Sequence, residues 1–347
     1  MHTFYFPGHA QHDPTQIGSA DGPEATLLID HPQRGDAICQ AIQEAGLGDI
    51  TAPGDFGGEP IEVIHEYGML NLLQDGYERL ATQNNQTAAL PDTFITSVRP
   101  LHKTRSIQGQ LGYYCFDRAS PLLAHTWQAA YWSVQTAVSA AALVAAGGET
   151  VAYALCRPPG HHAGPNSYGG RSYLNNAAIA ANWLVQQGRR VAVLDIDYHH
   201  GNGTQAVFYG RSDVLVCSIH ADPFYEYPYF WGFADEFGVG SGLNYNYNFP
   251  LSRGAQEATY LETLTAALIK IRLYVPDVLV LSLGTNIIEG DPGGSFRLHS
   301  DSLGRIGRQL AQLNIPLVVV QEGGYALTAV GQQIVSFFSG LLDSQKP

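Results

Sequence analysis

A dense group of ionisable side chains follows an apolar run in the middle of the chain. Asp195, Asp197, His199 and His200 lie within six residues, directly after the apolar residues 191–194. An apolar run that leads into acids and glycine is typical of a buried parallel strand entering a loop. Asp197 and His199 are two residues apart, so their side chains leave the same face of an extended backbone and can reach one divalent ion. The alternative is an aspartate at a strand end beside solvated histidines, but charges placed after a buried strand need partners to offset their desolvation.

Two more groups of candidate catalytic residues also follow apolar runs. His161 and His162 lie in a loop of prolines and glycines after residues 151–155. Tyr325 ends a Glu-Gly-Gly-Tyr turn after residues 317–320, where glycine permits a tight turn. Taken one at a time, a histidine pair or such a turn is more often structural than catalytic. Their shared position favours a site, because ligands of open α/β sheets bind at the carboxyl ends of the strands.

The four strand-end motifs occur in a recognisable order. They read R-P-P-G-H-H from Arg157, D-x-D-x-H-H-G-N-G-T from Asp195, G-x-x-x-x-E-x-D-P from Gly284 and E-G-G-Y from Glu322. With these motifs the chain resembles the histone deacetylase and acetylpolyamine amidohydrolase family of the arginase/deacetylase superfamily, from about residue 61 to the C-terminus, and its bacterial acetylpolyamine amidohydrolase branch in particular. The resemblance implies one α/β domain, residues 1–347, with a central eight-stranded, mostly parallel sheet and helices on both faces.

The resemblance also implies a metal site with one altered ligand. Asp197 and His199 match two zinc ligands of the family, and the third ligand, an aspartate in the family, falls on Asn286. Two carboxylates would cancel the double charge of zinc, whereas one leaves the site positive, so we expect weaker metal binding and an inactive or weakly active chain. Iron(II) is an alternative to zinc, because ligand type discriminates weakly between them. A structural potassium site is implied at the backbone carbonyls around Asp195, Asp197 and His199, with Ser218 and Ile219.

The remaining matched residues have catalytic roles in the family. His162 matches the general base, His161 matches its partner, oriented by Asp195, and Tyr325 matches a phenol that donates to the substrate carbonyl. This set suits hydrolysis of a linear amide by a metal-activated water. The ion polarises the carbonyl, an imidazole takes the proton of the water and passes it to the leaving amine, and the phenol stabilises the oxyanion.

Residues 84–123 lack regular periodicity and are rich in polar turn residues. We expect an insertion loop at the active-site mouth and, by the resemblance, a homodimer contact. An acid that faces the distal ammonium of a polyamine in that branch falls on Gln108, and the aromatic residue expected after Gly170 is Arg171. Both changes disfavour a cationic substrate, unless Arg171 turns outward to solvent or Asp117 restores the charge. The candidates for the substrate tunnel are Tyr168, Gly170, Arg171, Phe224, Tyr227 and Gln108.

The apolar runs alternate with helical stretches, which is the pattern of a parallel sheet covered by helices. Residues 7–30 form a second segment without periodicity, which we expect to be a loop. We expect strands at 151–155, 191–196, 214–218, 278–283 and 316–320, and helices near 126–146, 175–187, 257–273, 301–313 and 326–341.

Composition excludes several classes of protein. The chain has 347 residues, of which 45% are hydrophobic, and a net charge of −13, so it can bury a large core and has no basic surface for nucleic acid. Its four cysteines form no C-x-x-C pair, which favours a reducing, cytoplasmic location. Neither a signal-peptide pattern nor an apolar run of about 18 residues indicates a membrane.

Three functions fit the sequence. The first is a zinc amidohydrolase that removes an acetyl or other acyl group from a small N-acylated amine such as an acetylpolyamine. The second is a protein lysine deacetylase, which the long loops at the mouth disfavour. The third is a non-catalytic protein that binds a ligand, and Asn286 is its sole support. An arginase-like hydrolase is disfavoured, because His161 and His162 with Tyr325 fit one metal better than two.

Overall fold

The expected α/β fold is confirmed by the computed structural model, which describes residues 1–17, 28–84, 87–96 and 104–343. Eight strands form one sheet in the order β2-β1-β3-β8-β7-β4-β5-β6, and each pair of neighbours is parallel. The strands are β1 (His2–Tyr5), β2 (Ile50–Thr51), β3 (Val151–Leu155), β4 (Val191–Asp195), β5 (Val214–Ala221), β6 (Asn246–Leu251), β7 (Val278–Leu283) and β8 (Leu317–Gln321).

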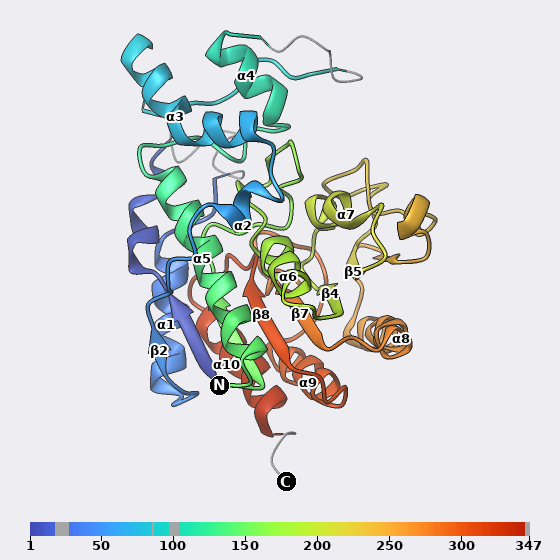
Figure 1. Cartoon of the computed structure of the whole chain (residues 1–347). Coiled ribbons are helices and arrows are strands. Elements are labelled where there is room, and N and C mark those ends of the chain that lie inside the picture. Colours follow the sequence, from blue (N-terminus) through green and yellow to red (C-terminus); the bar gives the residue numbers. More distant parts are fainter. Residues whose placement is uncertain (18–27, 85–86, 97–103, 344–347) are drawn as a thin grey trace.

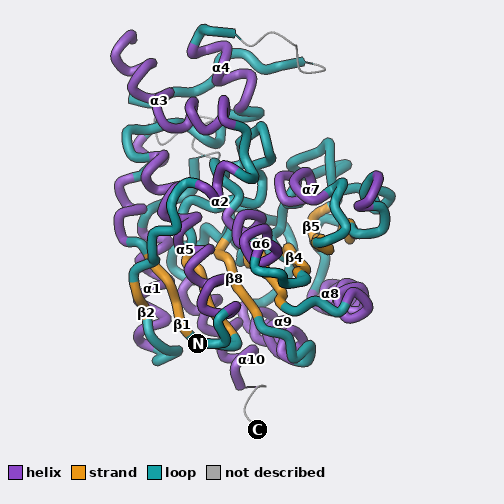
Figure 2. The backbone as a smooth tube through the Cα atoms, in the orientation of Figure 1, coloured by secondary structure: helices purple, strands orange, loops and turns teal. Residues whose placement is uncertain are grey.

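Helices cover both faces of this sheet, as Figures 1 and 2 show. They are α1 (Gln33–Glu44), α2 (Glu59–Glu62), α3 (Tyr67–Asn84), α4 (Ile107–Tyr114), α5 (Thr126–Ala145), α6 (Asn176–Gln186), α7 (Asn202–Phe208), α8 (Glu257–Tyr274), α9 (Ser300–Ala311) and α10 (Val330–Asp343). Short 3-10 helices lie at Pro7–Gln11, Pro14–Gln16 and Gly240–Gly242. No helix in the described ranges is long and apolar enough to cross a membrane.

Successive residues of the buried strands point to opposite faces and so contribute to two cores. In β3, Tyr153 and Leu155 pack in a cluster with residues of α1, α8, α9 and α10. Ala152 and Ala154 pack on the other face, against alanines of α5 and α6. Small side chains on both sides let these helices lie close to the sheet. The alanine-rich part of α5 is therefore core packing, as its sequence predicts.

The predicted strands and helices are confirmed with shifts of a few residues, and the largest shift has a local cause. The last helix begins at Val330 instead of the expected residue 326. The backbone N–H groups of Tyr325 and Ala326 donate to one carboxylate oxygen of Asp291, at 2.7 and 3.0 Å. Because this carboxylate holds Tyr325 and Ala326 outside the helix, residues 327–329 form a turn and the helix starts about one turn later.

The segment 84–123 is not all loop, because it contains α4. Figure 1 shows α4 beside α3 at the end of the molecule opposite the C-terminus. Leu111 and Tyr114 of α4 are buried in a third core cluster with Met69 and Leu73 of α3. Residues 97–103 of this segment and residues 18–27 of the other expected loop lie outside the described residues.

Sheet order decides which motifs can form one site. β3, β8, β7 and β4 are consecutive neighbours, although they are far apart in the sequence. Since all of them are parallel, their carboxyl ends lie at one edge. The loops after these four strands carry the histidine pair, the Glu-Gly-Gly-Tyr turn, Asn286 and the Asp195 motif, so the predicted residues share one edge of the sheet.

Candidate active site

Asp197, His199 and Asn286 come together at the ends of β4 and β7. His199 Nδ1 lies 3.5 Å from Asp197 Oδ1, and Asn286 Nδ2 donates to the same oxygen at 2.9 Å. Asp197 and Asn286 are buried. Gly284 and Gly323 line this site, and a Cβ on either would lie within 2.6 Å of both Asp197 and Asn286 side-chain atoms. The two glycines therefore leave space for a compact polar centre.

The orientation of Asn286 is fixed by a backbone group. The Tyr198 N–H donates to Asn286 Oδ1 at 3.1 Å, and only the carbonyl oxygen of a carboxamide can accept this bond. The amide nitrogen of Asn286 must then face Asp197. Rotating the carboxamide to offer its oxygen to a metal would leave the buried Tyr198 N–H facing another N–H, which is costly. Asp197 and His199 thus fit a divalent ion, and Asn286 does not fit as the third ligand.

This orientation bears on the third ligand position, on which Asn286 falls in the sequence. A carboxylate at position 286 could accept from the Tyr198 N–H with one oxygen and turn the other toward Asp197, whereas in this orientation the carboxamide presents an N–H there. Within the described ranges, no group of three or more His, Cys, Asp or Glu side chains could hold a metal ion. Asn286 therefore presents a donor toward Asp197, and both ends of its carboxamide are hydrogen-bonded within the protein.

His161 and Asp195 form a buried ion pair on the other side of the site. His161 Nδ1 donates to Asp195 Oδ2 at 2.9 Å, and His161 Nε2 lies 3.9 Å from Asp197 Oδ1. Burial lowers the pKa of His161, but the charges of Asp195 and Asp197 outweigh burial and raise this pKa to about 10. The two carboxylates therefore favour the protonated form of His161.

His162 is the neutral member of the pair. Burial and the nearby charges of His161 and His199 hold the pKa of His162 well below its usual value. Its ring centroid lies 4.0 Å from that of His161. His162 Nδ1 lies 2.8 Å from Asn202 Oδ1, a carbonyl oxygen, so Nδ1 carries the proton and donates. The lone pair of His162 Nε2 remains available to accept a proton, which is what a general base requires.

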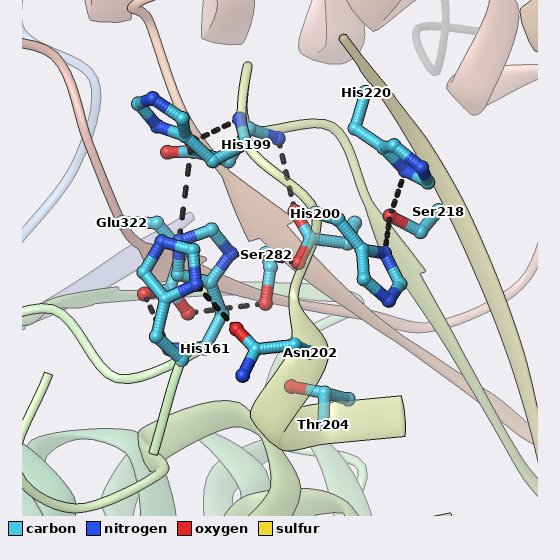
Figure 3. A network of polar contacts seen from close by, with 12 residues as sticks. His161, His199, His200, Asn202, Thr204, Ser218, His220, Ser282 and Glu322 are labelled. Atoms are coloured by element: carbon cyan, nitrogen blue, oxygen red, sulfur yellow. Dashed lines mark hydrogen bonds and ion pairs between the residues drawn. The ribbon is translucent and has the colours of Figure 1, made fainter. Parts of the chain in front are cut away.

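Glu322 supports the histidine loop, a role that sequence reasoning did not assign. Its Oε2 accepts from the backbone N–H groups of Gly160 and His161 at 2.7 and 3.2 Å, and its Oε1 accepts from the Ser282 hydroxyl at 3.1 Å. Burial raises the pKa of Glu322 to about 7. Figure 3 shows this network around His161. The available signal was an acid at the end of a buried strand, which needs partners.

Tyr325 reaches the site from the turn after β8. Asp291, another residue without an assigned role, accepts from the Tyr325 backbone N–H, and both residues are buried. Two guanidinium groups lie over the Tyr325 ring, Arg34 at 5.4 Å and Arg171 at 5.0 Å from its centroid. Burial raises the pKa of Tyr325 to about 12, so its phenol keeps its proton and can donate a hydrogen bond.

A cavity of about 450 Å³ opens over His199. Of the predicted tunnel residues, Gly170, Arg171 and Tyr227 border it. The ring of Tyr227 lies edge-on to His162 and His199, with centroids 4.9 and 5.7 Å apart. The other lining residues are Asp117, Arg118, Ala119, Tyr198, Glu226, Tyr229, Pro292, Gly293, Gly294 and Ser295.

Three other tunnel candidates lie away from this cavity. Tyr168 is fully buried in the core cluster that contains α3 and α4, because its backbone pairs with residue 115 and directs the ring inward. Phe224 is 73% exposed and packs against Phe233. Gln108 is on α4 and does not border the cavity within this single chain.

The residues of the expected potassium site lie next to one another. Asp195 of β4 pairs in register with Ser218 of β5. The Ser218 hydroxyl lies between His200 Nδ1 and His220 Nδ1, at 3.1 and 2.7 Å, as Figure 3 shows. Ile219 is buried in the core. A potassium ion at this strand end stays a prediction.

Comparison with known proteins agrees with the resemblance noted in the sequence. Residues 28–341 match the family model of the histone deacetylase domain. The chain is 43% identical to acetylpolyamine amidohydrolase 2 of Pseudomonas aeruginosa over 92% of its length and 93% of that protein. It is 40% identical to the acetylpolyamine amidohydrolase of Burkholderia pseudomallei over 98% of both chains.

Solved structures agree with these matches. The crystal structure of the acetylpolyamine aminohydrolase from Burkholderia pseudomallei superposes with a TM-score of 0.92, at 39% identity, over 99% of both chains. The HDA15 HD domain shares the fold, with a TM-score of 0.80 at 23% identity. The chain therefore belongs to the histone deacetylase family, within its acetylpolyamine amidohydrolase branch.

Proposed function

We propose that this chain is a zinc-dependent amidohydrolase that acts slowly, removing an acetyl group from a small N-acylated amine. The observation that carries the proposal is the neutral His162, whose Nε2 can accept a proton and whose ring centroid lies 6.0 Å from that of His199, a residue that borders the cavity. The names of the relatives support acetylated polyamines as the starting substrate class. Hydrolysis by this route uses a base, a hydrogen-bond donor to the carbonyl and a metal ion, and His162 and Tyr325 would supply the first two.

Each of these residues would have a separate role in the proposed reaction. When bound at Asp197 and His199, a zinc ion would polarise the amide carbonyl and lower the pKa of a water molecule. His162 would accept the proton of the attacking water and return it to the departing amine. His161 stays protonated beside Asp195 and so keeps His162 neutral at physiological pH. The Tyr325 phenol would donate to the carbonyl oxygen, a contribution of about 3 kcal/mol for one well-placed donor.

Asn286 accounts for the low rate that we propose. Its amide N–H faces the position where the family has a ligand oxygen, so zinc would have one carboxylate and one imidazole as protein ligands. Loss of a negative ligand weakens the attraction for a doubly charged ion. Iron(II) at the same two residues is the alternative metal. A second function, ligand binding without turnover, is favoured by the same orientation of Asn286.

The remaining properties of the proposal come from the branch to which the chain belongs. We propose a structural potassium ion at the ends of β4 and β5, and a homodimer in which the segment 84–123 forms a contact. A cytoplasmic location is supported by the four cysteines, all within the described residues and all free.

Acetate release tests the proposal. The chain and its Asn286→Asp variant would be supplied with zinc and given acetylated diamines, acetyl-lysine peptides and neutral acetanilides. We expect at least about 100-fold faster release by the variant, comparable to the effect of perturbing a metal site. Asn314→Asp, which adds the same charge on the exposed surface, is the control and should not change the rate.

Zinc content measured on the same samples separates the outcomes. Activity that appears together with bound zinc in Asn286→Asp supports the proposal. Equal activity in both chains would show that the argument from Asn286 is wrong. A variant that binds zinc and releases no acetate from any substrate would favour ligand binding without turnover.

A further inference from the structure

Arg171 has a backbone conformation that arginine rarely adopts. Its φ is 67°, in the left-handed region that favours glycine. The turn around it is held on both sides. Gly169 and Ser172 exchange two backbone hydrogen bonds of 3.1 and 2.9 Å, and the Arg171 N–H donates to the Ser120 hydroxyl at 2.7 Å. An unfavourable local conformation that tertiary contacts maintain is a reason to ask what its side chain does.

The side chain of Arg171 turns into the site. It borders the cavity together with His199 and Tyr227, and its guanidinium carbon lies 5.0 Å from the centre of the Tyr325 ring. This contact settles the alternative left by the sequence, in which Arg171 pointed to solvent. Guanidinium stays protonated at any physiological pH, so a permanent positive charge stands beside the phenol that would meet the scissile amide.

The other charged groups that border the cavity are Asp117, Glu226 and Arg118. Asp117 Oδ2 accepts from the Gly170 N–H at 2.7 Å and from the Tyr227 hydroxyl at 2.8 Å. Glu226 forms an ion pair with a surface residue, Arg253. Both carboxylates are therefore engaged by protein donors. Asp117 braces the wall that carries Arg171, and a substrate ammonium would have to compete with these bonds.

We propose that Arg171 is a specificity-determining residue that selects N-acyl amines with a carboxylate a few bonds from the scissile amide, in preference to acylated diamines. The proposal rests on the proposed function and names its substrate class. A planar guanidinium can donate two parallel N–H bonds to a carboxylate, whereas it repels an ammonium in the same place. This refines the class suggested by the relatives, because the charge of Arg171 is opposite to what a polyamine ammonium requires at that position.

A matched set of three small amides tests this assignment. N-acetyl-4-aminobutyrate, N-acetylputrescine and N-butylacetamide present the same acetamide on a four-carbon chain and differ in the charge of the far end. The kcat/KM for each would be measured with Asn286→Asp, and the dissociation constant of each with the chain as it stands. We expect the carboxylate to be preferred over the ammonium by about tenfold or more, since a hydrogen bond between charged groups supplies this much.

Three variants separate a direct contact from a general effect of charge. Arg171→Asn removes the charge with a residue that tolerates a positive φ, and should abolish the preference. Arg171→Lys keeps the charge without the planar pair of donors, and should retain part of it. Arg118→Met removes the other arginine of the cavity wall, whose Nη1 donates to the Pro91 carbonyl at 2.9 Å. It should leave the preference in place.

The results distinguish this inference from the proposed function. Hydrolysis that favours N-acetylputrescine, or a preference lost equally in Arg171→Asn and Arg118→Met, would overturn the role of Arg171 while amide hydrolysis stands. Neither binding nor hydrolysis of any of the three amides would overturn both. A carboxylate preference that Arg171→Asn alone abolishes would establish Arg171 as the selecting residue.

Discussion

The two halves of the candidate active site differ in how their polar groups are satisfied. On the side that handles protons, His161 pairs with Asp195, His162 donates to Asn202 and Glu322 supports the loop that carries both histidines. On the side that would hold the metal, Asp197 accepts from the amide of Asn286 and from the backbone N–H groups of His199 and Gly323. The first half leaves one imidazole nitrogen of His162 without a proton, and the second is satisfied by hydrogen bonds within the protein.

The difference shows that a carboxamide can be fully accommodated at position 286 by hydrogen bonds alone. Asn286 accepts from the Tyr198 N–H and donates to Asp197. A change that would otherwise leave a buried group without a partner is therefore tolerated by the fold. We expect such a substitution to reduce metal binding far more than stability.

The largest predicted effect concerns the half that handles protons. In the Asn286→Asp background, His162→Ala should reduce kcat by about 1,000-fold, within the usual range for a general base. Zinc content should not change, because His162 is not a proposed ligand. His125→Ala, at an exposed histidine, is the matched control. An active His162→Ala variant would show that His162 is not the general base.

The next prediction concerns the buried ion pairs that stabilise the histidine side of the site. Asp30 is buried between Arg34 and Arg157, at 2.9 and 3.3 Å, and Arg34 donates to the Glu322 carbonyl at 2.7 Å. Asp30→Asn would leave two buried guanidinium groups uncompensated, so chemical denaturation should show a loss of at least about 3 kcal/mol. Asp75→Asn, which breaks an exposed pair with Arg79, should change stability by less than about 1 kcal/mol. Similar losses in the two variants would contradict the assigned role of the buried network.

A third prediction concerns how strongly zinc stabilises the chain and its Asn286→Asp variant. At a zinc concentration of about 100 times its dissociation constant, Asn286→Asp should gain about 2.7 kcal/mol of stability. If Asn286 weakens binding by about 100-fold, the same zinc stabilises the unaltered chain by about 0.4 kcal/mol. Thermal unfolding with zinc and with a chelator measures both values. Equal gains would mean that Asn286 does not impair the site.

The smallest predicted effect is the dependence of stability on pH. His65 holds the histidine loop, because its Nδ1 donates to the Gly164 carbonyl at 2.9 Å and its Nε2 accepts from the Asn175 N–H at 3.0 Å. Burial lowers the pKa of His65 from 6.5 to about 4. The unfolded chain therefore binds a proton at higher pH than the folded chain, and stability that is complete above pH 6.5 is lost as the pH falls toward 4.

His65→Gln isolates this contribution, because glutamine can keep both hydrogen bonds and does not titrate. Between pH 7.5 and 5.5 the unaltered chain should lose about 1 kcal/mol more than the variant. Protonation of the other buried histidines destabilises both proteins equally, so their contributions cancel in the difference. Parallel pH profiles would show that His65 is not held neutral by the fold.

Much of the fold and the candidate site could be predicted from the sequence, because the signals are local. Apolar runs that end in Asp, His or Gly predicted the buried strands and the loops after them, and the motifs after β3, β4, β7 and β8 proved to share one edge of the sheet. The start of α10 could not be predicted in this way. It depends on Asp291, which belongs to a different loop.

The sequence by itself determined which residue types reach the strand ends, and hence that candidates for a base, a phenol donor and two metal ligands would be present. Only the tertiary structure decided how Asn286 and Arg171 are oriented. The Tyr198 N–H fixes the carboxamide of Asn286, and contacts around Ser120 turn Arg171 toward Tyr325. Tyr168 was directed into the core for the same reason. Side-chain direction depends on hydrogen bonds between segments distant in sequence, which spacing along the chain does not reveal.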